Sequence, residues 1–309
     1  MFKIKHLLIL SFTIIALTIA GCKSQFEKIR LSNDVAKKYQ EAMRLYNKKN
    51  YSKAIILFED LSQKYRGRAE AEDLNYYYSL TLYKLKDYTT ARYQFKSFAD
   101  TYPTSKYAEE CRYLGAYCYY LESPIWSLDQ ENTYKAIDAL QLFINFYPKS
   151  ERAADASKYI ADLRNKLETK AFNNAKLYYT LGGYDINNYK SAVIALKNAQ
   201  IDFPDIKFAE EMDLLIVKSQ FAYAKNSYET RQEDRYSEAI TYADEFIESH
   251  PESKLLPEAQ ELKKDSQAGI DNAKRVLAEI AKDEAKYKAM MAKDAKLDST
   301  TTTIKTPIK

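Results

Sequence analysis

Few side chains in this sequence could carry out chemistry. His250 is the only histidine after residue 6 in a chain of 309 residues, so no second imidazole accompanies it. The sequence also lacks a G-x-S-x-G nucleophile motif, a glycine-rich phosphate loop and the spacing of a metal-ligand set. We therefore predict no catalytic residues, no metal site, no bound cofactor and no enzymatic activity.

Two of the three cysteines, Cys111 and Cys118, lie in one stretch of helical periodicity. They are seven residues apart, which places them about 10.5 Å apart along a helix axis at about 1.5 Å per residue. A disulfide requires Cα atoms within about 7 Å of each other. We therefore expect both to be buried, small apolar residues, neither bridged nor bound to metal.

The third cysteine, Cys22, follows an N-terminal segment with the character of a signal peptide. Lys3 and Lys5 precede an apolar run over residues 7–20, which is shorter than the roughly 20 residues of a membrane-spanning helix. The run ends in Ala20-Gly21-Cys22, which resembles the lipobox of bacterial lipoproteins. The resemblance implies that residues 1–21 are removed and that Cys22 carries diacylglycerol on its sulfur and an acyl chain on its amino group. An ordinary secretory signal that ends near a cysteine is the alternative.

The residues after Cys22 bear on the membrane to which such an anchor would attach. Lys23-Ser24-Gln25 lacks the acidic residue that retains enterobacterial lipoproteins at the inner membrane, and it lacks the acidic cluster of surface-export signals. By this resemblance we expect a lipid-anchored protein on the periplasmic face of the outer membrane. Residues 22–34 would link the lipid to the fold.

Composition favours an all-helical chain. Glycine and proline are scarce (6 and 7 residues), and no run of Val, Ile or Thr alternates with polar residues. The 47 basic and 43 acidic residues nearly balance, which indicates a solvated surface and no nucleic-acid partner. The 28 tyrosines must either fill a core or line a contact surface.

A frame ending in an alanine recurs five times in apolar stretches of helical spacing; four copies read Tyr-x-x-Ala, and the third has Thr133 in place of the tyrosine. Its alanines are Ala54, Ala91, Ala136, Ala192 and Ala239. In four copies a proline follows twelve residues after the alanine and ends the helix. Upstream, Tyr39, Tyr76 and Tyr113 are spaced by 37 residues, as are Tyr46, Tyr83 and Tyr120. The sequence therefore predicts a series of helix pairs.

This frame resembles the tetratricopeptide repeat, with small residues and a proline at its characteristic positions. The resemblance implies an all-α fold, a tetratricopeptide-like α-α superhelix of about five helix pairs. We expect N-terminal repeats over residues 35–167, C-terminal repeats over 168–262, a helical extension over 263–297 and a disordered tail over 298–309.

Local signals suggest where some of these helices begin and end. Ser32 or Asn33 could cap the first helix. Residues 122–133 form an insertion inside the third pair, and the polar residues 229–235 suggest a loop inside the fifth. The apolar positions Ile270, Ala273 and Ile280 suggest that the extension packs on the last repeat.

In the tetratricopeptide frame the fifth and ninth positions of the first helix face the concave groove. Here these positions are Tyr39, Met43, Tyr76, Leu80, Tyr113 and Tyr117. Tyrosine with Met and Leu suits an extended peptide with aromatic side chains, because each ring offers apolar area and a hydroxyl at low entropic cost. The twelfth positions, Tyr46, Tyr83 and Tyr120, could equally face the groove or pack between helices. Trp126 in the insertion could pin its loop or anchor a partner.

The segments around the third repeat resemble the BamD family, outer-membrane lipoproteins of the β-barrel assembly machinery. The matching stretches are residues 98–110, the insertion with Leu128-Asp129-Gln130, and Phe146-Tyr147-Pro148. The resemblance implies a non-catalytic scaffold that binds the BamA barrel protein and nascent outer-membrane proteins. A tetratricopeptide lipoprotein of another cell-envelope complex is the alternative.

Overall fold

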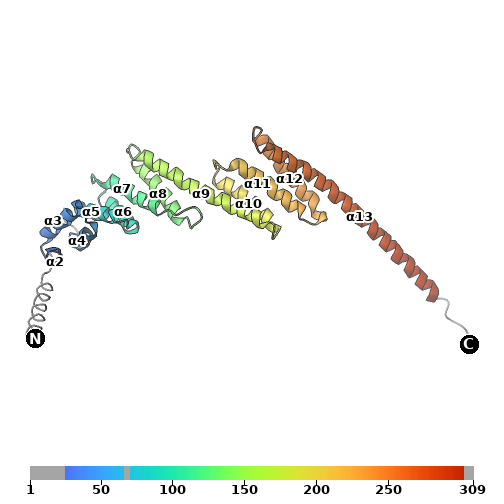
Figure 1. Cartoon of the computed structure of the whole chain (residues 1–309), viewed down its shortest axis with the longest axis horizontal. Coiled ribbons are helices and arrows are strands. Elements are labelled where there is room, and N and C mark those ends of the chain that lie inside the picture. Colours follow the sequence, from blue (N-terminus) through green and yellow to red (C-terminus); the bar gives the residue numbers. More distant parts are fainter. Residues whose placement is uncertain (1–24, 66–69, 303–309) are drawn as a thin grey trace, which may run out of the picture. The chain divides into compact units, whose positions relative to one another are not determined.

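The computed structural model describes residues 25–65 and 70–302, with side chains to residue 293. Over this range the chain forms twelve helices and no strand, which confirms the all-α prediction of successive helix pairs (Figure 1). Cys22 and the signal segment lie outside the described residues. The helices are α2 (Gln25–Arg30), α3 (Val35–Asn47), α4 (Tyr51–Lys64), α5 (Ala71–Lys84), α6 (Tyr88–Thr101), α7 (Ala108–Glu122), α8 (Glu131–Phe146), α9 (Ala153–Leu181), α10 (Asn187–Asp202), α11 (Ala209–Lys225), α12 (Glu229–Ser249) and α13 (Leu256–Thr302).

The chain divides into two compact units. Unit 1 ends at Asn165 and unit 2 begins at Lys166, so α9 contributes its first residues to unit 1 and the remainder to unit 2. All five alanines of the recurring frame are fully buried. Because alanine has the smallest side chain that still favours a helix, neighbouring helices approach closely at these points.

The core of unit 1 consists of two apolar clusters. The first joins α3 to α7 around Phe58, Phe95 and Phe98. The second joins α7, α8 and the first residues of α9 around Leu140 and Phe143. Each helix pair therefore packs mainly on the next pair along the chain, as in a repeat protein.

Two tight turns join the two helices of a pair in unit 1, α3 to α4 and α5 to α6. Lys49 and Lys86 adopt left-handed backbone conformations, with φ of 59° and 64°. After each, a backbone N–H bonds back to the preceding helix: Asn50 to the Leu45 carbonyl at 2.9 Å and Asp87 to that of Leu82 at 3.1 Å. These are the bonds of a helix C-cap that commonly uses glycine.

We expected Ser32 or Asn33 to cap α3, but the N-cap residue is Asp34. The Asp34 side chain accepts a hydrogen bond from the Lys37 N–H at 3.0 Å. Ser32 Oγ accepts instead from the Asp34 N–H at 3.0 Å and so orders the approach to the cap. An aspartate at this position also complements the helix dipole.

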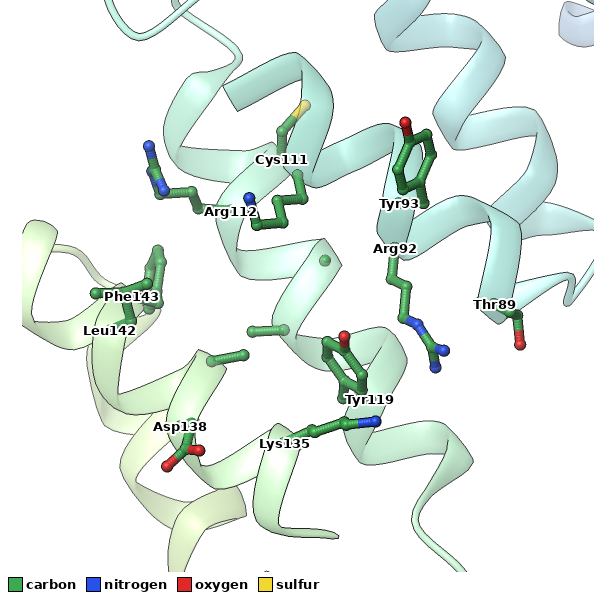
Figure 2. A pocket seen from close by; sticks show the side chains of 14 residues that line it. Thr89, Arg92, Tyr93, Cys111, Arg112, Tyr119, Lys135, Asp138, Leu142 and Phe143 are labelled. Atoms are coloured by element: carbon green, nitrogen blue, oxygen red, sulfur yellow. The ribbon is translucent and has the colours of Figure 1, made fainter. Parts of the chain in front are cut away.

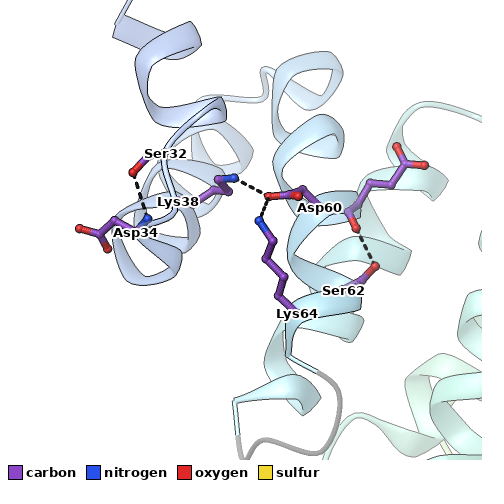
Figure 3. Close-up of polar contacts among 7 residues, drawn as sticks. Ser32, Asp34, Lys38, Asp60, Ser62 and Lys64 are labelled. Atoms are coloured by element: carbon purple, nitrogen blue, oxygen red, sulfur yellow. Dashed lines mark hydrogen bonds and ion pairs between the residues drawn. The ribbon is translucent and has the colours of Figure 1, made fainter.

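An ion pair between a buried lysine and a partly exposed aspartate joins α3 to α4 (Figure 3). Lys38 is only 2% exposed, and its ammonium group contacts the carboxylate of Asp60. Lys64 Nζ binds the same carboxylate at 3.0 Å. The hydrogen bond from Lys38 lowers the pKa of Asp60 below its usual value. An unpaired buried ammonium would cost several kcal/mol, roughly, so the pair fixes α3 against α4.

Unit 2 repeats the helix-pair plan with one boundary that differs from our prediction. Residues 229–235, expected to form a loop, are the first turns of α12, and the connection is limited to residues 226–228. The segment has no apolar stripe, yet Glu, Gln and Arg favour helix. Gln232 Nε2 also donates to the Ser227 carbonyl at 2.8 Å, which orders this start of the helix.

Helix α13 covers the last repeat and then continues. Ile270 and Ala273 are buried against unit 2, as predicted, whereas Ile280 is exposed. A Cβ on Gly269 would lie 2.4 Å from the ring of Tyr236, so glycine is needed for this close approach. The helix reaches Thr302 and so includes residues 298–302, for which we expected disorder; residues 303–309 lie outside the description.

Candidate functional site

The tyrosines predicted to line a groove lie on α3, α5 and α7 of unit 1. Rings from neighbouring segments stand among them: Tyr65 lies 6.2 Å from Tyr39, and Tyr107 stacks on Tyr76 at 3.9 Å between centroids. Farther along, Tyr159 of α9 lies 5.0 Å from Tyr117. We call these rings the tyrosine row. It comprises the predicted Tyr39, Tyr76, Tyr113 and Tyr117, the twelfth-position Tyr46, Tyr83 and Tyr120, and the adjoining Tyr65, Tyr107 and Tyr159.

The six predicted residues differ in how much surface they offer. Tyr76 and Leu80 are each 8% exposed, so their side chains belong mainly to the core of unit 1. The other four, Tyr39, Met43, Tyr113 and Tyr117, are half-buried and present an edge to solvent. Peptide binding by these residues stays a prediction, and only the half-buried four offer substantial contact area.

The twelfth-position tyrosines pack against rings while remaining half-buried. Tyr46 meets Tyr77 at 5.2 Å, Tyr83 meets Phe95 at 6.4 Å, and Tyr120 meets Tyr159 at 4.4 Å. Tyr46 and Tyr120 therefore join a helix pair to the next one, and Tyr83 joins α5 to α6 within a pair. Tyr77 and Tyr159 had no place in the 37-residue spacing, so that signal could not reveal them.

Carboxylates accompany the phenol groups of the tyrosine row. Tyr76 donates its hydroxyl to Glu110 Oε2 at 2.8 Å, and Tyr120 donates to Asp162 Oδ2 at 3.0 Å. Burial raises the pKa of Tyr46 to about 12 and, together with the Glu110 carboxylate, raises that of Tyr76. The phenols are therefore neutral at physiological pH. Such a surface suits apolar, aromatic and cationic side chains.

The insertion places Trp126 in the loop between α7 and α8, where it is 39% exposed. The loop backbone is held by the buried side chain of Gln130, which donates to the carbonyls of Ile125 at 2.8 Å and Leu128 at 2.9 Å. The side chains of Ile125 and Leu128 are exposed. A partner contact at Trp126 stays a prediction, on a loop whose backbone is already fixed.

The two cysteines of α7 are buried and free, as predicted from their spacing. Burial raises the pKa of the Cys118 thiol to about 12 and raises that of Cys111 as well. Since only the thiolate is a strong nucleophile or metal ligand, both side chains act here as small apolar groups.

A comparison with protein families gives one match. Residues 32–184 match the YfiO family, described as an outer membrane lipoprotein, and this range contains α3 to α9 with all of the tyrosine row. A search of curated proteins finds no match. Among the described residues, no helix is long and apolar enough to cross a membrane. Over the matched range the chain is similar to the outer-membrane lipoproteins of this family.

Proposed function

We propose that this protein is a non-catalytic scaffold of the outer-membrane protein assembly machinery, held at the periplasmic face of the outer membrane by lipid on Cys22. The match of residues 32–184 to an outer-membrane lipoprotein family carries the proposal. Its partners would be a BamA-like barrel protein and nascent outer-membrane proteins. The helix pairs support such a role, since stacked helices present extended surfaces for binding.

The tyrosine row is the proposed binding surface for nascent barrel proteins. Their strands end in aromatic residues, and an extended peptide could place these against the half-buried edges of Tyr39, Tyr113 and Tyr117. Glu110 and Asp162 hold neighbouring hydroxyl groups, which reduces the rotational freedom lost on binding.

Co-purification of the full chain from detergent-solubilised membranes tests the assembly role. A BamA-like barrel protein should be recovered with it in stoichiometric amount, and depletion of the protein should reduce many outer-membrane barrels together. Recovery of a different set of envelope proteins, with barrel levels unchanged, would refute this role and favour a scaffold of another envelope complex.

The anchor and the tyrosine row can be tested separately. Cys22→Ala should release the protein into the soluble periplasmic fraction; retention in the membrane would contradict the lipid anchor. Tyr113→Ala with Tyr117→Ala should weaken binding of peptides from barrel C-termini about tenfold or more, because two aromatic contacts are lost. Tyr184→Ala, at an exposed tyrosine of unit 2, is the matched control. Equal affinities would assign Tyr113 and Tyr117 to packing alone.

A further inference from the structure

A second surface of unit 1 is hollowed between α6 and α8. Figure 2 shows the side chains of α6 and α8 on either side of α7. The cavity has a volume of about 590 Å³, and small residues of α7, Cys111, Gly115 and Ala116, form its floor. We call it the α6–α8 groove. The lining residues of α7 differ from those that α7 contributes to the tyrosine row.

The corresponding position one repeat earlier is filled. Gly115 stands 37 residues after Tyr78, in the same register as the tyrosines of the row. Tyr78 is buried in the core of unit 1, whereas Gly115 has no side chain to place between the helices.

The corresponding positions of unit 2 are also filled. Gly115 lies twelve residues after Pro103, and Ile216 lies twelve after Pro204. On the other wall, Ala139 and Tyr242 each lie three residues after an alanine of the frame. Ile216 and Tyr242 reduce the space between α10 and α12 to about 280 Å³.

Packing of α6 on α7 does not require glycine at position 115. A Cβ there would lie 3.4 Å from the Phe95 Cβ and at least that far from all other atoms of neighbouring segments, which is ordinary van der Waals contact. Since a methyl group would fit, the structural consequence of this glycine is the depth of the groove.

The walls of the groove have the periodicity of two helix ridges. On α6 and on α8, lining residues recur at intervals of three, four and seven positions: Thr89, Arg92, Tyr93 and Lys96, and Lys135, Asp138, Ala139 and Leu142. Tyr93 and Leu142 are large apolar side chains exposed at the rims. Two such ridges above an apolar floor are the shape into which a third helix packs.

Positive charge predominates among the residues that line the groove. The lining includes four cationic side chains, Arg92, Lys96, Arg112 and Lys135, and one carboxylate, that of Asp138. Outside the lining, Arg92 pairs with Glu122, and Arg112 pairs with Asp100 at 3.3 Å. Arg92 also stacks on Tyr119, with its guanidinium carbon 4.4 Å from the ring centroid, so its position is fixed before any ligand binds.

The two lysines are held only by pairs within one turn of their own helices. Lys96 binds Asp100 at 2.6 Å and Lys135 binds Glu131 at 2.5 Å, all on exposed side chains. Exposed pairs of this kind contribute little stability, so both ammonium groups can exchange to a carboxylate of a ligand.

We propose that the α6–α8 groove binds an acidic amphipathic helix of a partner protein. Its apolar face would lie over Gly115 and Ala139, and Asp or Glu residues on its flanks would meet Lys96 and Lys135. This inference goes beyond the assembly role proposed above, because it concerns a second surface and a helical rather than an extended ligand.

Fluorescence titration of the full chain with a labelled peptide tests the proposal. The probe is a helical peptide of about 16 residues, with Leu and Ala on one face and Glu on its flanks. A second peptide carries Lys in place of each Glu. We expect the acidic peptide to bind at least about tenfold more tightly than the basic one, and less tightly as salt concentration rises.

Ala139→Tyr is the variant that closes the groove. It copies Tyr242 at the matching position of unit 2, where a tyrosine is accommodated, and should reduce affinity for the acidic peptide at least about tenfold. Gln141→Tyr is the control, since residue 141 is exposed on α8 and outside the lining. Far-ultraviolet circular dichroism and the melting temperature should stay unchanged in both.

Three outcomes would overturn the proposal. They are absence of acidic-peptide binding, equal binding of both peptides, and binding that Ala139→Tyr leaves intact. A dimer in sedimentation that Ala139→Tyr dissociates would assign the groove to a second copy of this chain, which also refutes it. None of these outcomes bears on recovery of a BamA-like protein, so the two proposals fail separately.

Discussion

The α6–α8 groove of unit 1 and the space between α10 and α12 of unit 2 occupy the same positions of the repeat. The first is open to solvent, whereas side chains fill most of the second. Phe143 and Phe246 are both buried at matching positions, so the same core supports each. Above the core, Gly115 and Ala139 leave unit 1 open, whereas Ile216 and Tyr242 fill unit 2. The difference shows that a binding surface can arise in a repeat through the absence of side chains outside the core.

The two regions also differ in how their polar groups are satisfied. In unit 2, Asp213 accepts from Gln200 Nε2 at 2.6 Å and lies 2.8 Å from His250 Nε2. Lys197 lies over the ring of Tyr242, 4.0 Å from its centroid. The polar groups of unit 2 therefore bind partners from neighbouring helices of the same unit. In unit 1, by contrast, Lys96 and Lys135 pair only with exposed residues of their own helices.

The largest expected effect tests whether the two cores are equivalent. Phe143→Ala and Phe246→Ala should each lower the free energy of unfolding by about 3–5 kcal/mol, because each leaves a cavity beneath its helix pair. Urea unfolding followed by circular dichroism measures both. A small loss for one variant and a large loss for the other would break the comparison.

The ion pair between Lys38 and Asp60 in unit 1 gives the next largest effect. Asp60→Asn should lower the free energy of unfolding by about 2–3 kcal/mol, because the buried ammonium of Lys38 loses its counter-charge. Lys38→Met in the same chain should recover most of this loss. Hydrogen exchange should show faster opening in α3 and α4 with unit 2 unchanged; an equal change in unit 2 would contradict a local role.

Acid should reproduce part of this effect in the unmodified protein. The hydrogen bond from Lys38 lowers the pKa of Asp60, so the carboxylate stabilises the fold above the ordinary carboxyl pKa of about 3.9. This contribution is lost as pH falls through the lowered folded value. Asp60→Asn should lack this step when unfolding is measured below about pH 4.

Exchanging Ala139 and Tyr242 each for the residue of the other unit has a smaller effect on stability, and an unequal one in the two units. Tyr242→Ala should cost about 1–2 kcal/mol, since the ring and its contact with Lys197 are lost. Ala139→Tyr should change the free energy of unfolding by less than about 1 kcal/mol, because the new ring enters open space. Thermal unfolding of both variants gives the values. A large loss for Ala139→Tyr would mean that the walls of the groove cannot separate as those of unit 2 do.

The smallest effect concerns the helix-pair turns. Lys49→Gly and Lys86→Gly should each raise the free energy of unfolding by about 0.5–1 kcal/mol, because glycine adopts positive φ without steric cost. Asn226→Gly in the α11–α12 connection is the control. Its φ is −95°, so glycine should give no gain there. Destabilisation by Lys49→Gly would show that the lysine side chain contributes more than its backbone strain costs.

Much of the fold could be predicted because its signals are local. The spacing of apolar residues indicated helices, the recurring alanines marked points of close helix approach, and the distance between Cys111 and Cys118 excluded a bridge. Local competition at helix ends was harder to judge. Asp34 caps α3 in place of its neighbours, and the polar start of α12 had no apolar stripe to reveal it.

The sequence by itself determined the helix pairs and the positions of their core residues, because residues three and four apart share a helix face wherever the helix lies. Only the tertiary structure decided that Tyr76 lies in the core while Tyr113 keeps an exposed edge, and that Gly115 leaves a groove. Burial of a side chain depends on residues that neighbouring helices bring to it. Because those residues come from other repeats, the periodicity of apolar residues within one helix cannot predict which side chains they bury.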